Sequence, residues 1–385
     1  MTRLDGLARW LAREAPRESV ADLFPAFCRE VVACGLPLWR GSLALEVLHP
    51  EVSGWLHVWQ DEAVTVRESD RATAETSSSY LNSPTKIVDD TNRPFRRRLD
   101  VPCPAMPLLE ELREAGATDY FMLPLPFLDR TRTAAISFAT RQAGGFGEPE
   151  LAELHLAADL VGPYVERHVL RRIAVDLLDT YVGPRTGSRI IEGRIARGVP
   201  ERIEAALWFT DLRGFTRFSE ETPLDEVLDS LNAWFEIMAE VIEAGGGEVS
   251  KFIGDAVLAV FPITPERGPA AACRDALAAA RAFGARTDAA NVARAEEGRM
   301  PLAFGLALHC GEVAYGNVGA ARRLDFTVMG PAVNRASRLL DLAKRLRRRV
   351  VVSGAFQDQV GEPLVPLGVH TLRDVPEPLA VFALP

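Results

Sequence analysis

The sequence predicts a mixed α+β protein in which a helical linker joins two domains. The chain has 385 residues, more than a single hydrophobic core usually organises. Apolar residues recur at helical spacing over residues 148–182, and short apolar runs alternate with helical patterns on either side of this segment. We therefore expect domains at residues 1–147 and 203–385, with a long helix and a connector at residues 148–202.

The first domain is expected to combine helices and strands. Apolar residues at helical spacing predict helices near residues 4–11 and 20–31. Strand-like runs, separated by turns that Pro and Gly mark, lie at residues 41–48, 54–59, 121–127 and 133–140.

The linker helix carries a narrow apolar stripe that Pro163 interrupts. The stripe consists of Leu151, Leu154, Ala158, Val161, Val165, Val169, Ile173 and Leu177. A narrow stripe on a long helix is typical of a parallel dimer seam. The alternative is a helix that packs on its own domain. The segment 181–204, which is rich in Gly, Pro and Arg, predicts a connector.

The second domain alternates strands and helices. Residues 205–210 predict a short strand, and the apolar face over residues 224–242 predicts a helix. Two strands over residues 248–253 and 256–261 are joined by Gly-Asp at 254–255, which predicts a tight hairpin with a carboxylate at its tip. A further strand is expected at residues 302–308, and a flexible or closely approached turn after it is expected at Gly311, Gly316 and Gly319.

Composition argues against several classes of partner. The 53 acidic and 44 basic residues give a net charge of −9, so general nucleic-acid binding is not expected. We interpret the local basic run at residues 344–349 as a solvated helix face. No apolar run approaches the length that a bilayer requires, so membrane insertion is not expected either.

Cysteine usage indicates a reducing compartment. The five cysteines are scattered and nowhere form Cys-x-x-Cys; they are Cys28, Cys34, Cys103, Cys273 and Cys310. This pattern argues against a disulfide framework and against a zinc knuckle. The N-terminal apolar pattern is interrupted by charges, unlike a signal peptide, so we expect a cytoplasmic protein.

Two aspartates mark the candidate chemistry. Asp211 and Asp255 end apolar runs that predict neighbouring strands, and each has a glycine nearby in the sequence. A carboxylate at the end of a buried strand, where a glycine lets another molecule approach the backbone, is suited to hold a divalent cation against a polyphosphate. Asn334 and Arg338 follow at four-residue spacing on a predicted helix, so their side chains share one face. The four residues together predict a catalytic site.

Three segments resemble, in order and spacing, the catalytic domain of class III adenylate and guanylate cyclases. They are residues 209–216 (FTDLRGFT), 251–256 (KFIGDA) and 327–338 (TVMGPAVNRASR), and the likeness covers about residues 203–385. It implies a ferredoxin-like cyclase fold that forms a 3′,5′-cyclic nucleotide and releases pyrophosphate. Such a reaction needs substrate positioning and charge neutralisation more than covalent chemistry.

The resemblance implies a role for each motif residue. Asp211 and Asp255 would hold two divalent cations, Mg²⁺ or Mn²⁺. Asn334 would orient the ribose, and Arg338 would stabilise charge on the α-phosphate, a task that suits the guanidinium fork. The phosphates are expected to meet backbone N–H groups of the turn formed by Leu212, Arg213, Gly214, Phe215 and Thr216.

Base selection falls to Lys251 and Thr327 under this resemblance. In the family, Lys with Asp or Thr at these positions reads adenine, whereas guanylate cyclases usually carry Glu and Cys, so ATP is the expected substrate. Arg373 stands where the family commonly has a lysine that touches the terminal phosphates. Arginine keeps the cation but not the compact ammonium, so substrate affinity or pyrophosphate release is expected to differ.

The expected active site is shared between two chains. In this family the metal aspartates of one protomer face the base-reading residues, Asn334 and Arg338 of the other. One chain carries both halves here, so a homodimer with two composite sites is expected. The alternatives are a guanylate cyclase, which turnover of ATP and GTP would separate, and a catalytically silent nucleotide sensor or dimerisation module. A silent module usually lacks a metal aspartate or the Asn/Arg pair, and this chain has both.

The first domain resembles a GAF domain in residues 41–48, 83–88, 119–127 and 133–138. The resemblance implies an antiparallel sheet with a ligand-sized pocket for an unnamed small-molecule or protein signal. Five aromatic residues are candidates for the pocket lining or for the core: Trp39, Trp55, Trp59, Tyr120 and Phe121. We expect the linker helix to transmit the state of this domain to the catalytic dimer.

Overall fold

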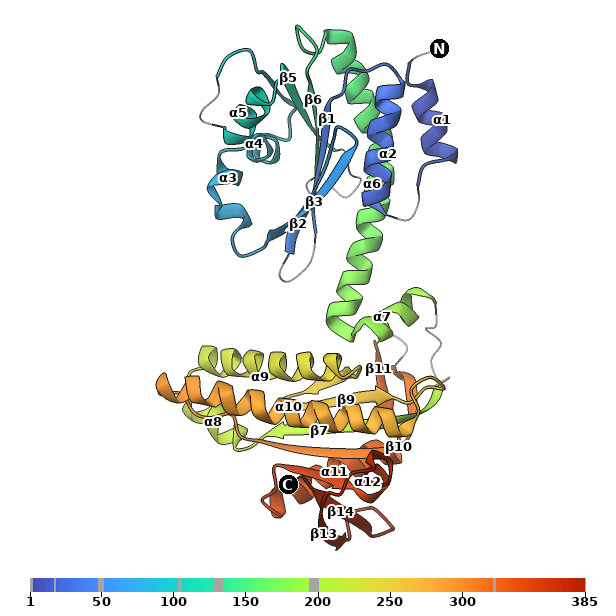
Figure 1. The fold of residues 1–385 in the computed structure, drawn as a ribbon, viewed down its shortest axis with the longest axis vertical. Coiled ribbons are helices and arrows are strands. Elements are labelled where there is room, and N and C mark those ends of the chain that lie inside the picture. Colours follow the sequence, from blue (N-terminus) through green and yellow to red (C-terminus); the bar gives the residue numbers. More distant parts are fainter. Residues whose placement is uncertain are drawn as a thin grey trace. The chain divides into compact units, whose positions relative to one another are not determined.

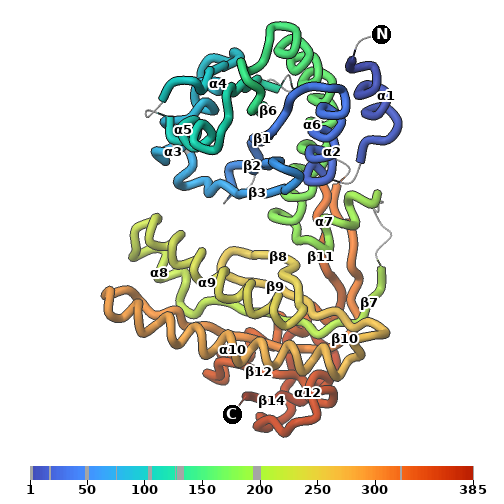
Figure 2. Tube along the Cα trace, turned by 45° about the horizontal axis from the view of Figure 1, so that its top comes forward, coloured from blue at the N-terminus to red at the C-terminus, as the bar shows by residue number. Residues whose placement is uncertain are grey.

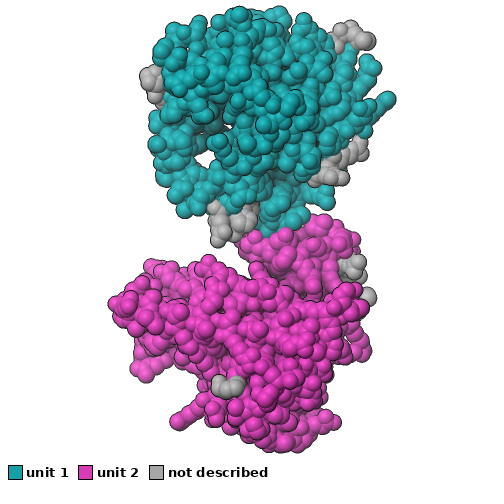
Figure 3. All heavy atoms as spheres, viewed as in Figure 1, with its two compact units in different colours: residues 1–177 teal, residues 178–385 magenta. Residues whose placement is uncertain are grey.

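The structure is a computed structural model that describes residues 3–16, 19–47, 52–102, 106–125, 127, 134–193, 201–320 and 323–384. The chain divides into two compact units, Met1–Leu177 and Leu178–Pro385 (Figure 3). Some features expected from the sequence fall on residues outside this description: Cys103, residues 194–200 of the connector, and Leu48, Pro126 and Thr133 of three expected strands.

Unit 1 is built on an antiparallel sheet whose strand order, within the described residues, is β3-β2-β1-β6-β5-β4 (Figures 1 and 2). Its strands are β1 Arg40–Glu46, β2 Val52–Gln60, β3 Ala63–Asp70, β4 Phe95–Arg98, β5 Asp119–Pro124 and β6 Ala134–Thr140. Its helices are α1 Asp5–Arg13, α2 Val20–Ala33, α3 Ser78–Leu81, α4 Pro84–Thr91, α5 Pro107–Glu114 and α6 Glu148–Val182, with a 3-10 turn at Ala74–Thr76. The antiparallel sheet that the sequence implies is thus confirmed.

The two faces of this sheet bury different helices. Successive residues of a strand point to opposite faces. Leu43, Leu45 and Phe121 pack with α1, α2 and α6, whereas Tyr120 and Met122 pack with α4 and α5. Four of the five aromatic candidates belong to these two cores: Trp39, Trp59, Tyr120 and Phe121. Trp55 remains half-buried.

The long helix α6 packs on its own unit. Its apolar stripe is buried in the unit 1 core from Leu151 to Ile173, and only the last member, Leu177, is exposed. The stripe is therefore not free to form the expected dimer seam, and the alternative, packing on its own domain, is correct. α6 runs continuously through Pro163, and its bounds, Glu148–Val182, match the long helix expected over residues 148–182.

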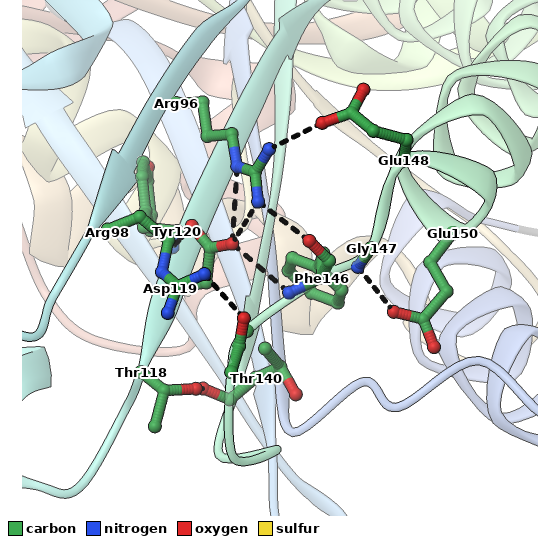
Figure 4. A network of polar contacts seen from close by, with 12 residues as sticks. Arg96, Arg98, Thr118, Asp119, Tyr120, Thr140, Phe146, Gly147, Glu148 and Glu150 are labelled. Atoms are coloured by element: carbon green, nitrogen blue, oxygen red, sulfur yellow. Dashed lines mark hydrogen bonds and ion pairs between the residues drawn. The ribbon is translucent and has the colours of Figure 1, made fainter.

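A buried carboxylate fastens the beginning of α6 to the sheet (Figure 4). Asp119 of β5 is fully buried and accepts two hydrogen bonds from Arg96, at 2.9 and 3.2 Å. It also accepts from two backbone N–H groups, one of them that of Phe146 at 3.1 Å. Gly145 has φ = +70°, and a Cβ at this position would lie 2.7 Å from the Asp119 carboxylate. A glycine is therefore required where the chain passes Asp119 to enter α6.

Unit 2 contains the second sheet, with strand order β13-β14-β12-β10-β7-β9-β8 and β11 paired to β10 among the described residues. Its strands are β7 Glu201–Leu212, β8 Glu248–Ile253, β9 Ala256–Pro262, β10 Phe304–Ala320, β11 Arg323–Met329, β12 Val350–Ser353, β13 Val365–His370 and β14 Leu379–Ala383. Its helices are α7 Pro184–Ile191, α8 Phe215–Glu221, α9 Leu224–Ala244, α10 Pro269–Glu296, α11 Pro331–Arg345 and α12 Gly354–Val360. Within the described ranges, no helix is long and apolar enough to cross a bilayer.

Helices cover both faces of the second sheet. Trp208 of β7 and Phe283 of α10 belong to a core that also includes α9 and α12. On the other face, Leu207 of β7 packs with Ala336 of α11. Both units therefore combine helices with sheets, which confirms the mixed α+β fold class.

Strand β10 is longer than the sequence predicts. The turn expected at Gly311, Gly316 and Gly319 is wrong, because all three glycines lie inside the strand, whereas the close approach expected as an alternative is present at Gly311. At Gly311 the reason is a close approach: a Cβ would lie 3.1 Å from the Cβ of Ala332 in α11. The glycine therefore serves helix packing on the sheet and not a turn.

Candidate active site

The two candidate metal-binding aspartates lie on neighbouring elements. Asp211 is the penultimate residue of β7, and Asp255 occupies the turn between β8 and β9. β7 pairs with β9, and the backbone N–H of Leu212 donates to the Asp255 carboxylate at 3.1 Å. The expected hairpin is thus present, and its tip reaches the end of the strand that carries Asp211.

The Asp211 carboxylate lacks a full set of partners. Its Oδ1 atom is buried and has no hydrogen-bond partner in the described part of the chain, and the nearest Arg213 nitrogen is 3.9 Å away. Burial raises the pKa of Asp211, the Arg213 guanidinium opposes this shift, and the charge of Asp255 adds to it. A buried oxygen without a partner is costly, and a cation beside two carboxylates would offset that cost. The residues present therefore fit a divalent cation.

The two carboxylates would be a sparse ligand set on their own. Among the described residues, no three His, Cys, Asp or Glu side chains form a group that would hold a metal ion. Mg²⁺ typically binds through one or two carboxylates and completes its coordination with water and substrate phosphates. The geometry therefore suits a cation that arrives with a polyphosphate better than a permanently caged ion.

Two of the five turn N–H groups that the sequence assigns to phosphates are already used within the protein. Leu212 donates to Asp255, and Arg213 donates to the carbonyl of Ala303 at 2.7 Å. The others lie at the beginning of α8, where helical N–H groups have no acceptor within the helix; they belong to Gly214, Phe215 and Thr216. Fewer backbone donors therefore remain for a phosphate than the sequence implies.

Helix α11 presents Asn334 and Arg338 away from the core. Ala336 on its inner side packs against Leu207 of β7, whereas Asn334 is exposed and Arg338 is half-buried. Asp211 follows Leu207 by an even number of residues along the same strand, so it points to the face that α11 covers. The aspartate and the α11 pair thus belong to one face of the sheet.

The carboxylate of Asp374 lies beside Arg338 and Arg373, the two arginines that are expected to contact phosphates. Arg338 donates to Asp341 at 3.4 Å and lies 4.0 Å from Asp374. Arg373, whose side chain is 82% exposed, lies 3.2 Å from the same Asp374. Asp341 and Asp374 were not singled out from the sequence, because neither lies in a position that the pattern marks. Asp374 lies beside both guanidinium groups, although Arg338 belongs to α11 and Arg373 follows β13.

The two base-reading candidates do not contact each other in the protomer. Lys251 of β8 instead forms an ion pair with Asp325 of β11. Thr327 donates its hydroxyl hydrogen bond to the adjacent carbonyl of Val328, at a long 3.5 Å. Asp325 is a further residue that sequence reasoning missed, although its place two residues before Thr327 on the same strand puts both side chains on one side of β11.

The candidate residues form separate groups within one protomer. Among the described residues, no hydrogen bond or ion pair joins Asp211 or Asp255 to Lys251, Asn334 or Arg338. The aspartates form one group, Lys251 and Asp325 a second, and the cations around Asp374 a third. A substrate that touches all of them has to bridge these groups.

The catalytic-domain model for adenylate and guanylate cyclases matches residues 200–359. Adenylate cyclase 1 of Rhizobium meliloti (strain 1021) is 36% identical over 160 residues, which are 41% of this chain and 24% of that protein. An adenylate cyclase of Anabaena cylindrica is 32% identical over 156 residues, which are 40% of this chain and 30% of the relative. The chain thus spans less than a third of the length of either relative.

Solved structures of cyclases align with about half of the chain. The adenylyl cyclase CyaB of P. aeruginosa aligns over 49% of this chain and 96% of its own, with 24% identity and a TM-score of 0.45. A bacterial light-regulated adenylyl cyclase aligns over 48% and 91%, with 29% identity and a TM-score of 0.41. The family match covers the strands and helices that carry Asp211, Asp255, Asn334 and Arg338. Residues 200–359 in the C-terminal half of the chain belong to the class III adenylate and guanylate cyclase catalytic-domain family.

Proposed function

We propose that this chain is an adenylate cyclase that converts ATP into 3′,5′-cyclic AMP and pyrophosphate at composite sites of a homodimer. The observation that carries the proposal is the buried Oδ1 atom of Asp211, which lacks a partner beside Asp255 on the sheet face that α11 covers. A structural carboxylate would be expected to have its hydrogen bonds satisfied. The Oδ1 atom of Asp211 is therefore available to bind a cation.

Asp211 and Asp255 would hold two divalent cations, Mg²⁺ or Mn²⁺. When bound, these ions supply charge neutralisation of the triphosphate and favour loss of the proton from the ribose 3′-hydroxyl. The protein's own contribution at this point is to hold both carboxylates in place, and the Leu212 N–H donates to Asp255.

The arginines of the third group, Arg338 and Arg373, would position the phosphates. The ribose 3′-oxygen attacks the α-phosphorus, the bond between this phosphorus and the pyrophosphate breaks, and the 3′-hydroxyl proton is released. Arg338 would stabilise the charge that develops on the α-phosphate, and Arg373 would contact the terminal phosphates. Both already sit beside Asp374, so exchange of this carboxylate for phosphate oxygens needs little side-chain movement. Asn334 would orient the ribose.

A second copy of the chain would complete each site. No hydrogen bond or ion pair joins Asp211 or Asp255 to Asn334 or Arg338 within the described protomer, as expected if they serve different sites. Exposed apolar side chains lie next to the functional residues: Phe252 and Ile253 between Lys251 and Asp255, and Leu324 beside Asp325. Burial of such side chains in an interface is favourable. An interface at these side chains would also include both groups of site residues.

Unit 1, with its GAF-like sheet, would regulate the catalytic unit. The supporting observation is that α6 is buried in the unit 1 core over most of its length and then continues past the division at Leu177. A change in the way unit 1 holds α6 would therefore be carried along one continuous helix. Weakening this attachment should change the rate of cyclic AMP formation at saturating ATP.

Purified full-length protein is expected to form cyclic AMP from ATP with Mg²⁺ or Mn²⁺, and to use GTP much less well. Asp255→Asn should lower turnover by about a thousandfold, because it removes a metal-binding charge worth several kcal/mol in the transition state. The amide oxygen can still accept from Leu212, so the fold is retained. Asp229→Asn, at an exposed residue of α9, is the matched control and should be fully active. Equal activity of Asp255→Asn would contradict the metal assignment, and faster turnover of GTP would favour the guanylate cyclase.

Asp325→Ala is expected to lower kcat/KM for ATP by about tenfold, mainly through KM. Without the carboxylate, Lys251 regains rotamer freedom that adenine binding must then restrict. The loss for GTP should be smaller, so the ratio of the two kcat/KM values is the measurement. Glu312→Ala removes an exposed acid of β10 and serves as control. An unchanged ratio in Asp325→Ala would mean that Asp325 does not position Lys251.

A further inference from the structure

Unit 1 contains a cavity of about 390 Å³ on the sheet face that carries α2 and α6. This is the face opposite α4 and α5. The cavity lies where the sheet extends beyond the two helices, over β2 and the edge strand β3, and the N-terminal end of α2 closes one side. Its volume falls in the range of pockets that hold small organic ligands.

The walls of the cavity are mostly apolar. Leu45 pairs with Trp55, and Trp55 pairs with Glu68, so these residues of β1, β2 and β3 share one face of the sheet. Leu45, Trp55 and Val66 form the floor, while Val169 and Val175 of α6 line the opposite side. The body of a ligand in this space would therefore be apolar.

A buried imidazole, whose Nδ1 atom lacks a hydrogen-bond partner among the described residues, lines this space. His57 lines the cavity and is only 6% exposed, yet its Nδ1 atom has no hydrogen-bond partner in the described part of the chain. Leaving a buried polar atom unpaired costs about 1–3 kcal/mol. Core histidines usually avoid that cost, so a polar ligand atom near His57 would stabilise the site.

The remaining charges at the cavity are mostly positive. Arg172 stacks over Trp55 at 5.3 Å and pairs with Asp176, and Trp55 donates to Glu68 at 3.3 Å. Arg171, also in the lining, has no ion pair or hydrogen bond with any described residue. Glu68, the one acid among the lining residues, thus already has a hydrogen-bond partner, and the guanidinium of Arg171 is available to bind an anion.

We propose that unit 1 binds a small organic anion in this cavity, with an aromatic or branched aliphatic body against Leu45, Trp55 and Val66. The anionic group meets Arg171, and a polar atom of the ligand meets His57. The ligand would touch α6 between His168 and Val175, shortly before the division at Leu177. Any effect of the ligand on cyclase turnover rests on the proposed function, but its binding does not.

The test uses two fluorescent probes with the same ring system. 8-Anilinonaphthalene-1-sulfonate carries an anionic group, and N-phenyl-1-naphthylamine lacks it. Full-length protein is expected to bind the sulfonate saturably and more tightly than the neutral probe. Arg171→Gln should weaken binding of the sulfonate by about tenfold and leave the neutral probe unchanged, because only the charged contact is lost.

Two further variants make the outcome decisive. Val66→Trp fills the cavity from an exposed strand position that tolerates an aromatic residue, and should remove binding of both probes. Arg67→Gln removes a neighbouring charge that points to the other face of the sheet, and should change neither. Circular dichroism checks that each variant is folded. The proposal is overturned if the wild type shows no saturable binding, if Val66→Trp binds the sulfonate as the wild type does, or if Arg171→Gln and Arg67→Gln behave alike.

Discussion

A one-to-one mixture of Asp211→Ala and Arg338→Ala chains is expected to recover about one quarter of wild-type turnover, although each variant alone should be inactive. If each site takes its aspartates from one chain and its arginine from the other, a mixed dimer has one site with both defects and one intact site. Random exchange makes about half of the dimers mixed, and half of their sites are intact. The measurement is cyclic AMP formation before and after subunit exchange.

A second mixture serves as the control for this result. Asp211→Ala and Asp255→Ala affect the same half of the site, so every site of their mixed dimers lacks one aspartate and the mixture should remain inactive. Recovery in both mixtures would point to exchange artefacts. No recovery in the first mixture, with mixed dimers demonstrated by differently tagged chains, would place the complete site within one protomer.

Asp119→Ala is expected to destabilise unit 1 by about 3 kcal/mol. The substitution leaves the Arg96 guanidinium without its buried partner and leaves the backbone N–H of Phe146 without an acceptor. The loss of stability should be in the lower part of the range found when one partner of a buried ion pair is removed, because Arg96 is 29% exposed and can turn toward water. Hydrogen exchange over β5 and the start of α6 should accelerate by about a hundredfold, the equivalent of that free energy.

Glu148→Gln provides the matched control for this prediction. Glu148 also pairs with Arg96, at 3.2 Å, but its side chain is almost fully exposed, so the substitution should cost well under 1 kcal/mol. Equal exchange rates in the two variants would show that the buried network does not anchor α6. The same samples test regulation: if unit 1 acts through α6, cyclase turnover should change in Asp119→Ala and not in Glu148→Gln.

The candidate site could be foreseen where its residues lie in short motifs. Asp211, Asp255, Asn334 and Arg338 each belong to a strand end, a turn or a helix face that local pattern predicts. Asp325 and Asp374 could not be foreseen in the same way. Their importance comes from contacts with Lys251 and with Arg338 and Arg373, across separations in sequence that no local pattern encodes.

The fold was predictable in segments whose buried face gives the sequence a periodic apolar pattern. α6, β8 and β9 begin and end close to the expected positions, because their apolar faces repeat with the period of a helix or a strand. β3 is exposed along its whole length, so it has no buried face, and β4 consists of one phenylalanine and three arginines, which do not alternate. Hydrogen bonding to β2 and β5 decides that these segments are strands.

Motif order and helical periodicity are local properties, so the sequence alone predicts a cyclase catalytic domain in the C-terminal half and a long helix before it. The burial of the apolar stripe of α6 in the core of unit 1 follows only from the fold, since periodicity shows that a face is buried and not what buries it. The same limit applies to Asp211. Its position marks a carboxylate at a strand end, but the absence of a partner for its buried oxygen among the described residues depends on every group that surrounds it.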